Sequence, residues 1–156
     1  VRNCVMHNDK CGNAMEIGFE TQTENISDIT FQNIDVIAAH GEGGVFTIHN
    51  GDRACISRVL YENIRVEHFY DKLVDFRIMH SRYSKDQTRG SVRDVRLKNI
   101  EVVADAYNTV SLLGGYDADH TIEGVTFENF NMGDKKVTGA DDINLFSRHA
   151  DNIKFL

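Results

Sequence analysis

The fold of this chain is decided by the stretch Ile26-Ser27-Asp28-Ile29-Thr30-Phe31-Gln32-Asn33-Ile34, a nine-residue motif that recurs along the sequence. Further copies run over residues 56–64, 92–100 and 122–130, and residues 1–9 fit the motif at its first eight positions. Each copy reads aliphatic-x-x-(Val/Ile/Cys)-x-(Phe/Tyr/Leu/Met)-x-Asn. Because the apolar residues alternate with others, a repeat of this kind predicts strands stacked in successive coils.

The spacing of the copies supports this interpretation. They begin at residues 1, 26, 56, 92 and 122, which gives intervals of 25, 30, 36 and 30 residues. Repeats of this length are typical of solenoids, propellers and arrays. Alternating apolar positions such as Ile29 and Phe31 have the periodicity of a strand, and the Leu-x-Leu signature of leucine-rich repeats does not occur. The unequal intervals indicate loops of different length inserted into a constant coil.

A second alternating segment follows each copy of the motif. These segments are residues 15–18, 46–49, 74–77, 110–113 and 143–146. About five coils of this kind predict an all-β fold, a right-handed parallel β-helix. We expect residues 1–156 to form a single domain and, since the first copy opens directly at Val1, to be part of a longer solenoid. Open solenoid ends expose strand edges, so we also expect self-association there.

One Asn per copy falls at the same position of the motif. These residues are Asn8, Asn33, Asn63, Asn99 and Asn129. In a stack of coils their side chains would lie above one another, where each amide can both donate and accept a hydrogen bond. We therefore interpret them as a structural ladder and not as a binding site.

Stacking the second strands aligns two rows of outward-facing residues. The first row reads Glu16, Thr47, Asp75, Ser111 and Asn144, and the second reads Gly18, His49, Arg77, Leu113 and Phe146. With coils roughly 4.8 Å apart, Glu16 and Asp75 are expected about 9.6 Å apart. That is close to the upper limit of the roughly 6.5–9.5 Å separation in inverting glycosidases, which leaves room for a water molecule. Both are candidate catalytic carboxylates. The alternative is that such a row is polar because it faces water.

Three further clusters combine residue types that bind sugars or transfer protons. They are His7 with Asp9; His49 with Asp52 and Arg53; and His80 with Arg82 and Tyr83. The first offers an acid or base, the second could bind sugar hydroxyls or shift the pKa of a carboxylate, and the third suits sugar or anion contact. Arg77 joins these candidates from the second outward row. Each cluster could instead form a turn or an ordinary loop, since Asn-Gly, Gly-Asp and Asn-Asp steps favour turns.

Composition narrows the possible functions only slightly. The net charge of −7 argues against nucleic acid, which binds concentrated Lys and Arg, and no apolar run reaches the length of a membrane span. Three cysteines with no CxxC pattern argue against a disulfide scaffold. The seven His form no HxH or HExxH pattern, and no GxGxxG, P-loop or GxSxG sequence occurs. We therefore expect neither a metal nor a cofactor.

A family resemblance adds to this interpretation. The stretches Val5–Asp9, Ala14–Phe19, Ile26–Phe31, Asp35–Ile37 and Thr47–Ala54 resemble the catalytic β-helix of glycoside hydrolase family 49, which contains dextranases and isopullulanases. More loosely, the chain is similar to the pectin-lyase-like β-helices of the polygalacturonases. The resemblance implies an inverting hydrolase that acts on a polysaccharide through Asp side chains, in a secreted or periplasmic protein.

The resemblance is best over residues 1–70, and it transfers few roles. In that family the catalytic Asp-Asp pair lies on the coil before the His-Asn-Asp segment, and that coil would precede Val1. No residue of this chain inherits the catalytic roles, and the Gly-His-Gly and Arg-Ile-Lys signatures of polygalacturonases are absent. What the resemblance implies for His7, Asp9 and Glu16 is proximity to substrate.

Three functions fit these observations. The leading one is a polysaccharide-processing β-helix of glycoside hydrolase type, with a polysaccharide or oligosaccharide as partner. The second is a noncatalytic β-helix that binds glycan or serves as a structural element. The third is a polysaccharide lyase, which would hold Ca²⁺ among clustered acids such as Asp9, Glu16 and Glu20.

Overall fold

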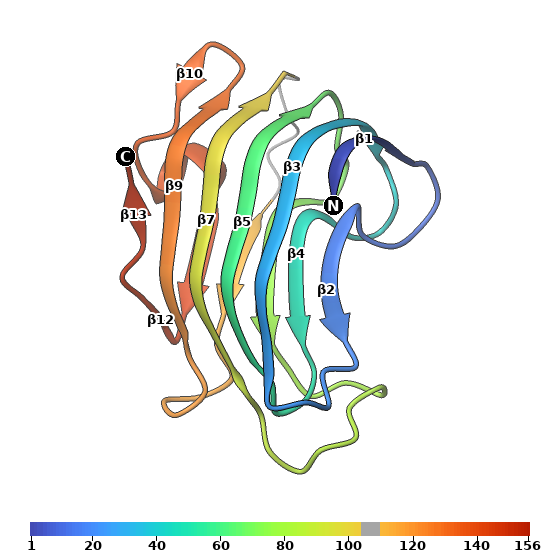
Figure 1. The fold of residues 1–156 in the computed structure, drawn as a ribbon. Coiled ribbons are helices and arrows are strands. Elements are labelled where there is room, and N and C mark those ends of the chain that lie inside the picture. The colour runs from blue at the N-terminus through green and yellow to red at the C-terminus, as the bar shows by residue number, and fades with distance from the viewer. Residues whose placement is uncertain (104–109) are drawn as a thin grey trace.

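The computed structural model describes residues 1–103 and 110–156 and consists of stacked parallel strands (Figure 1). The main strands of the first sheet are, in order, β1 (Arg2–Asn8), β3 (Asn25–Ala39), β5 (Cys55–Val66), β7 (Ser91–Val102) and β9 (Ile122–Met132). The second sheet contains β2 (Met15–Phe19), β4 (Gly44–Asn50), β6 (Lys72–Ile78), β8 (Ser111–Gly114) and β11 (Leu145–Arg148). Neighbours in both rows pair in parallel. The predicted parallel β-helix is confirmed, with about five turns.

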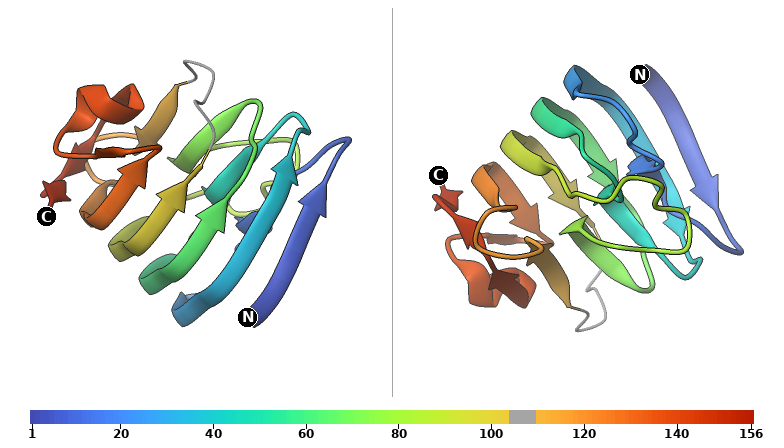
Figure 2. Two further views of the ribbon diagram at one scale, coloured as in Figure 1. Left: turned by 90° about the horizontal axis from the view of Figure 1, so that it is seen from above. Right: turned by 90° about the horizontal axis from the view of Figure 1, so that it is seen from below.

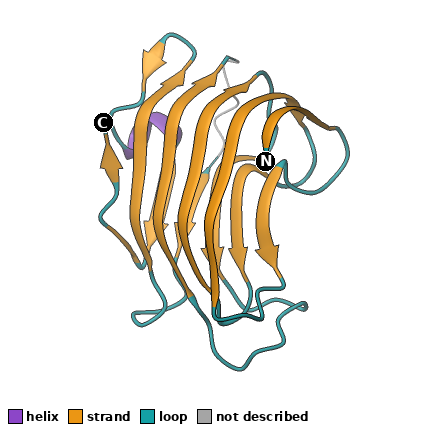
Figure 3. Cartoon of the chain, in the orientation of Figure 1, coloured by secondary structure: helices purple, strands orange, loops and turns teal. Residues whose placement is uncertain are grey.

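Short elements complete the C-terminal coils (Figure 3). β10 (Lys135–Lys136) pairs antiparallel with β9, whereas β12 (Ala150–Asp151) and β13 (Lys154–Phe155) pair parallel with it. One turn of 3-10 helix, η1 (Ala140–Ile143), is the only helix in the part of the chain that the structure describes. Figure 2 shows the strands of each sheet lying side by side in sequence order, so equivalent motif positions become neighbours.

The structure contains a sixth, partial copy of the motif that the sequence analysis missed. β12 and β13 pair with β9 so that residues 150–155 repeat the aliphatic-x-x-Ile-x-Phe part of the motif. The Phe155 ring stacks on Phe127 with centroids 5.0 Å apart, as Phe31 stacks on Tyr61 at the same distance. The apolar signal is present in the sequence, but residues 150–156 do not extend to the motif position that holds Asn in the other copies.

Each coil bends where residues adopt a left-handed backbone conformation. One bend falls at the Asn of the motif, where φ lies between 49° and 56°. The other falls at the third motif position, occupied by Asp28, Arg58, Asp94, Gly124 and Asn152. Asn, Asp and Gly tolerate this conformation best, which explains their recurrence. Arg58 is the exception, and its guanidinium donates two hydrogen bonds of 2.7 Å to Asp28 in the preceding coil.

The Asn side chains form the predicted ladder, with one correction. Each Nδ2 donates to the Oδ1 of the Asn in the preceding coil, over 3.1, 3.2, 3.0 and 2.8 Å. The members are Asn3, Asn33, Asn63, Asn99 and Asn129. Asn8 was the wrong first member, and its Nδ2 instead donates to the Gly12 carbonyl at 2.8 Å.

The pairing of β1 explains this error. Arg2 pairs with Gln32 and Cys4 with Ile34, so Asn3 and Asn33 make the first interval 30 residues instead of 25. Cys4 and Met6 pack against the core. Because the left-handed bend resets the alternation of side chains, these two residues face inward in either alignment, and the apolar pattern could not distinguish them.

The second sheet follows the predicted register in its first three coils and departs from it in the fourth. Asp75 pairs with Leu112 and not with Ser111. Ser111 and Leu113 are 1% and 0% exposed and point inward, whereas Val110 is 49% exposed. The prediction was wrong by one residue because adjacent apolar residues, Leu112 and Leu113, fit an inward position equally well.

A second one-residue shift follows in the fifth coil, which is therefore two residues away from the predicted register. Leu112 pairs with Phe146, while Asn144 lies in a left-handed conformation, with φ 47°, at the end of η1. Asn144 therefore does not belong to the first outward row. The second outward row reads Gly18, His49, Arg77, Gly114 and Arg148, in place of the predicted ending with Leu113 and Phe146.

Candidate functional site

Four side chains meet on the outer face of β2, β4 and β6, where the predicted register is correct. They are Glu16 on β2, His49 on β4, and Asp75 and Arg77 on β6. Side chains alternate along each strand, so these four point away from the core while their apolar neighbours point into it. We refer to these four residues as the charge cluster.

His49 lies at the centre of the charge cluster, between the two carboxylates. Its Nδ1 is 3.1 Å from Glu16 Oε1, and its Nε2 is 3.1 Å from Asp75 Oδ2. Arg77 donates to both oxygens of Asp75, from Nε at 2.5 Å and from Nη2 at 2.6 Å. The imidazole ring therefore occupies the space between Glu16 and Asp75 where the sequence analysis expected room for a water molecule.

The charge cluster is mostly shielded from water. The exposed fraction of the side chain is 1% for Asp75 and 3% for His49, against 20% for Glu16 and 37% for Arg77. Thr47, between Glu16 and Asp75 in the outward row, is also buried, and its Oγ1 donates to a backbone carbonyl at 2.6 Å. A ligand on this face could touch Glu16 and Arg77 directly, but it could reach Asp75 only through its neighbours.

Charge pairing outweighs burial in setting the protonation states. Burial alone would lower the pKa of His49, but its contacts with Asp75 and Glu16 raise that pKa above its ordinary value of 6.5. Burial alone would raise the pKa of Asp75, but hydrogen bonds from His49 and Arg77 hold that pKa below 3.8. Both directions favour the charged forms, so positive and negative groups alternate along the cluster. Arg77 Nη2 and His49 Nε2, 3.2 Å apart, then share Asp75 Oδ2 as their acceptor.

The contact between Glu16 and His49 lacks a well-aligned hydrogen bond. Glu16 Oε1 and His49 Nδ1 are buried and make no hydrogen bond of acceptable geometry, although they lie 3.1 Å apart. Leaving a buried donor or acceptor in this state costs about 1–3 kcal/mol. Such groups are rare in folded proteins. The Glu16–His49 contact is therefore a close ion pair without a well-aligned hydrogen bond.

Residues outside the repeat hold the charge cluster in place. Asn13 Nδ2 donates to Glu16 Oε2, and Asn13 Oδ1 accepts a 2.7 Å hydrogen bond from the Gly44 amide. Phe19, at the end of β2, covers His49 with ring centroids 4.7 Å apart. Neither Asn13 nor Phe19 was predicted as a site residue, because neither occupies a position of the repeated pattern.

An insert, residues 79–90, connects β6 to β7 at the bottom of Figure 1. It accounts for the long interval of 36 residues between the motif copies that begin at residues 56 and 92. Tyr83 packs against Phe19 with ring centroids 5.7 Å apart, and the Arg82 guanidinium lies 4.8 Å from the centre of the Tyr83 ring. His80 is exposed on the same insert. The insert thus reaches back from the third coil to the first and brings Tyr83 onto Phe19, the residue that covers His49.

Asp52 and Arg53 mainly contact the backbone and the insert. Asp52 is 0% exposed and accepts hydrogen bonds from the amides of Thr21, Lys85 and Asp86 at 3.1, 2.6 and 2.8 Å. Burial alone would raise its pKa, but these backbone donors hold that pKa below 3.8. Arg53 donates to Asp86 at 2.8 Å. These contacts match the turn with an ion pair that was the alternative interpretation, and a role in sugar binding stays a prediction.

His7 and Asp9 are placed apart from the charge cluster. His7 is exposed on β1, and Asp9 is exposed in the following loop, where its Oδ1 lies 3.7 Å from His40 Nδ1. Among the described residues, neither one contacts a member of the charge cluster. Their proposed proximity to substrate is therefore independent of the four residues above.

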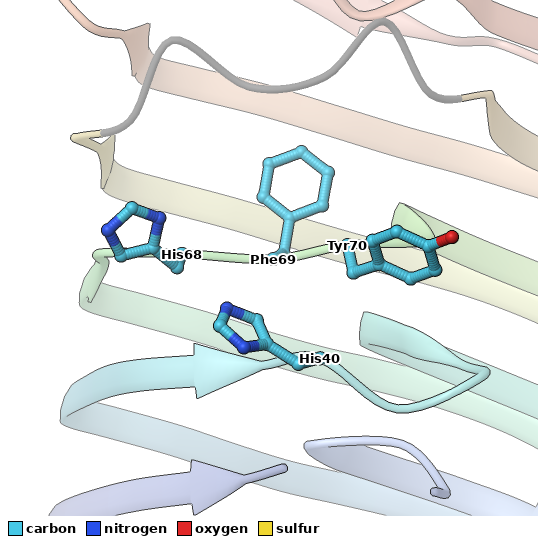
Figure 4. Close-up of a pocket in the computed structure, with 4 residues that line it drawn as sticks. All are labelled: His40, His68, Phe69 and Tyr70. Carbon is cyan, nitrogen blue, oxygen red and sulfur yellow. The ribbon is translucent and has the colours of Figure 1, made fainter. Parts of the chain in front are cut away.

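A separate cavity lies at the turns that follow β3 and β5 (Figure 4). Its volume is about 320 Å³, and it is lined by His40, His68, Phe69 and Tyr70. The rings of His40 and His68 meet edge to face, with centroids 6.0 Å apart. Across residues 1–103 and 110–156, no three His, Cys, Asp or Glu side chains are grouped as metal ligands, so Asp9, Glu16 and Glu20 do not form such a group.

Comparisons with family models, curated proteins and solved structures gave no match to this chain. The strand pairing shows the β-helix fold. The relationship to glycoside hydrolase family 49 or to the polygalacturonases stays a prediction from the sequence. Within the described ranges, no helix is long and apolar enough to cross a membrane.

Proposed function

We propose that the outer face of β2, β4 and β6 contacts a polysaccharide, and that the chain is part of a polysaccharide-processing β-helix of glycoside hydrolase type. The charge cluster carries this proposal. Its buried members hold two groups at the surface, the Glu16 carboxylate and the Arg77 guanidinium. A carboxylate and a guanidinium held in fixed positions can accept hydrogen bonds from sugar hydroxyls and donate to them.

The spacing of the coils suits a polymeric ligand. Neighbouring strands are roughly 4.8 Å apart, and Glu16, His49 and Arg77 come from three successive coils. A polysaccharide that runs along the solenoid axis would meet Glu16 on the first coil and Arg77 on the third. Tyr83 and Arg82 add an aromatic ring and hydrogen-bond donors at the edge of this face.

Glu16 is the carboxylate on this face that is best placed to act as an acid or base. It is partly exposed, and the adjacent His49 can hold or return a proton. Asp75, the other candidate carboxylate, acts in this proposal through His49, which it keeps charged and oriented. Hydrolysis by a pair of carboxylates would then use a second carboxylate from outside this face, as the family resemblance implies.

Noncatalytic glycan binding is the second candidate function. The observation that favours it is the burial of Asp75 and His49, which leaves one partly exposed carboxylate in the charge cluster. A surface of this kind can bind sugar hydroxyls without cleaving a bond. The two candidates differ in what Glu16 does, so a single substitution separates them.

The test measures binding and cleavage independently. We expect dextran, pullulan or polygalacturonate in a native gel to retard the purified chain, and Tyr83→Ala to weaken that retardation. Tyr116→Ala is the matched control, because Tyr116 is also exposed, at 49%, but lies in the loop after β8. Binding to none of these polymers, or an equal loss in both variants, would overturn the proposal.

The isosteric change Glu16→Gln then distinguishes the two functions. If the face is catalytic, this variant should retain binding but release reducing ends from the bound polymer at least about tenfold more slowly. If the chain binds without cleaving, neither wild type nor variant releases reducing ends, and the hydrolase assignment fails.

A further inference from the structure

Two side chains of opposite charge are buried at the base of the insert, residues 79–90. Asp52, in the turn after β4, is 0% exposed, and Arg89, in the insert itself, is 6% exposed. Burying a charge is unfavourable unless hydrogen bonds satisfy it. Both side chains make these hydrogen bonds with backbone groups of neighbouring segments. The two charges therefore fix the backbone conformation of those segments.

Asp52 connects three segments of the chain. Its Oδ1 accepts from the amides of Lys85 and Asp86 in the insert, and its Oδ2 accepts from the amide of Thr21 after β2. The Asp52 amide in turn donates to Thr21 Oγ1 at 2.9 Å. Thr21 Oγ1 then donates to Asn50 Oδ1 at 2.6 Å, at the end of β4. The centre of the insert is thereby tied to the ends of β2 and β4.

Arg89 makes the complementary contacts with carbonyl groups. Its Nη1 donates to the carbonyls of Gly51 and Met79, the latter at 3.2 Å, and its Nη2 donates to the carbonyl of Asp86. Met79 is the first residue of the insert and Asp86 lies near its centre. Arg89 thus links the start and the centre of the insert to each other and to the turn that contains Asp52.

We infer that Asp52 and Arg89 are positioning residues. They hold the backbone of the insert in its binding conformation before a ligand binds. Neither side chain needs to touch a ligand for this role. Their effect is to place Tyr83 against Phe19, which itself covers His49. Holding a binding loop in advance lowers the entropic cost of ligand association. The consequence for glycan binding rests on the proposed function above, whereas the course of the insert does not.

Hydrogen exchange of the unmodified chain tests the first part of the inference. The amides of Lys85 and Asp86 lie in a surface segment, yet we expect them to exchange at least about 100-fold more slowly than unprotected amides. Gln87 serves as the internal control, because among the described interactions its amide donates no hydrogen bond. Exchange of Lys85 and Asp86 at the rate of Gln87 would overturn the inference without requiring any variant to fold.

The substitution Arg89→Met tests the second part, with Arg93→Met on β7 as a control for loss of an exposed arginine. In Arg89→Met we expect trypsin to cleave after Arg82 and Lys85 about tenfold faster, while the strand amides stay protected. The gel retardation by glycan should weaken as in Tyr83→Ala. Unchanged cleavage would contradict the positioning role. Faster cleavage with unchanged retardation would contradict its link to binding. A wild type that binds no glycan refutes the proposed function and leaves the exchange test to decide the positioning role.

Discussion

His49 shows how stacking changes the chemistry of a single residue. In the sequence its partners Glu16 and Asp75 are 33 and 26 residues away, yet each lies 3.1 Å from one of its ring nitrogens. The two carboxylates raise the pKa of His49, while His49 and Arg77 lower the pKa of Asp75. The free energy of unfolding should therefore depend on pH at both ends of the range.

We expect the free energy of unfolding to fall at high pH, because His49 then loses its proton. A raised pKa in the folded chain contributes stability that is complete below 6.5, its ordinary value, and is lost as pH rises through the folded value. The lowered pKa of Asp75 contributes stability above 3.8 that is lost as pH falls through its folded value. Urea unfolding across this range measures both effects.

The variant His49→Gln supplies the comparison. It leaves the two carboxylates without their shared cation, so it should cost about 3–5 kcal/mol at neutral pH. It should also remove the decline in stability above pH 6.5. A variant that keeps the same decline would show that another group causes it.

The Asn ladder makes a second prediction at the residue scale. Asn63 donates to Asn33, accepts from Asn99 and has φ 53°. Asn63→Gly keeps the backbone conformation and should cost about 1–2 kcal/mol through the lost hydrogen bonds. Asn63→Ala should cost about 1–2 kcal/mol more, because a Cβ disfavours the left-handed region. Equal unfolding free energies for the two variants would refute the role of the bend.

At the scale of elements, the motif strands were predictable and the second strands only in part. β3, β5, β7 and β9 hold their predicted register because each copy fixes two bends and the apolar positions between them. β8 has only four residues and two adjacent leucines, so the side facing the core could not be read from the pattern. The alternation that places Leu113 in the core follows from its pairing with Phe76 in β6.

The corrected register of β8 can be tested with a matched pair of leucines. Leu113 is 0% exposed, and Leu113→Ala should cost about 2–5 kcal/mol through the cavity it leaves. Leu112 is only partly buried on the outer side, so Leu112→Ala should cost clearly less. Thermal or urea unfolding of both variants decides between the registers, and the opposite order of stabilities would restore the original one.

The candidate site was predictable to the same extent as the register. Stacking alone brought Glu16, His49, Asp75 and Arg77 onto one face. The pattern could not show that the imidazole ring lies between the carboxylates, since side-chain orientation depends on packing against residues such as Phe19. Nor could it place the insert, whose backbone contacts Asp52 in the turn after β4 and its own residue Arg89.

At the scale of the whole molecule, β1 forms the N-terminal edge of the first sheet, and one side of this strand is unpaired among the described residues. β1 pairs with β3, and the described residues provide no second partner for it. Val5 on this strand is 65% exposed. Unpaired strand edges favour association with other chains, so self-association at this edge stays a prediction for this chain.

Sedimentation velocity at increasing protein concentration tests that association. We expect Val5→Lys to weaken it, because a charged side chain on an edge strand disfavours further pairing. Ile37→Lys serves as the control, since Ile37 is also exposed, at 42%, but lies on β3. A monomer at every concentration, or an equal effect of both substitutions, would rule out this edge as the interface.

The stacking of coils in register underlies both the fold and the proposed site, and cysteine cross-linking tests it most directly. Thr30 pairs with Leu60 in the next coil, and paired strands are roughly 4.8 Å apart, within the 4.4–6.8 Å Cα separation of disulfides. With the three native cysteines replaced by alanine, Thr30→Cys with Leu60→Cys should form a disulfide under mild oxidation. Thr30→Cys with Glu62→Cys, two residues out of register and about 8 Å apart, should not. Efficient cross-linking of the second pair, or failure of the first, would contradict the parallel β-helix described here.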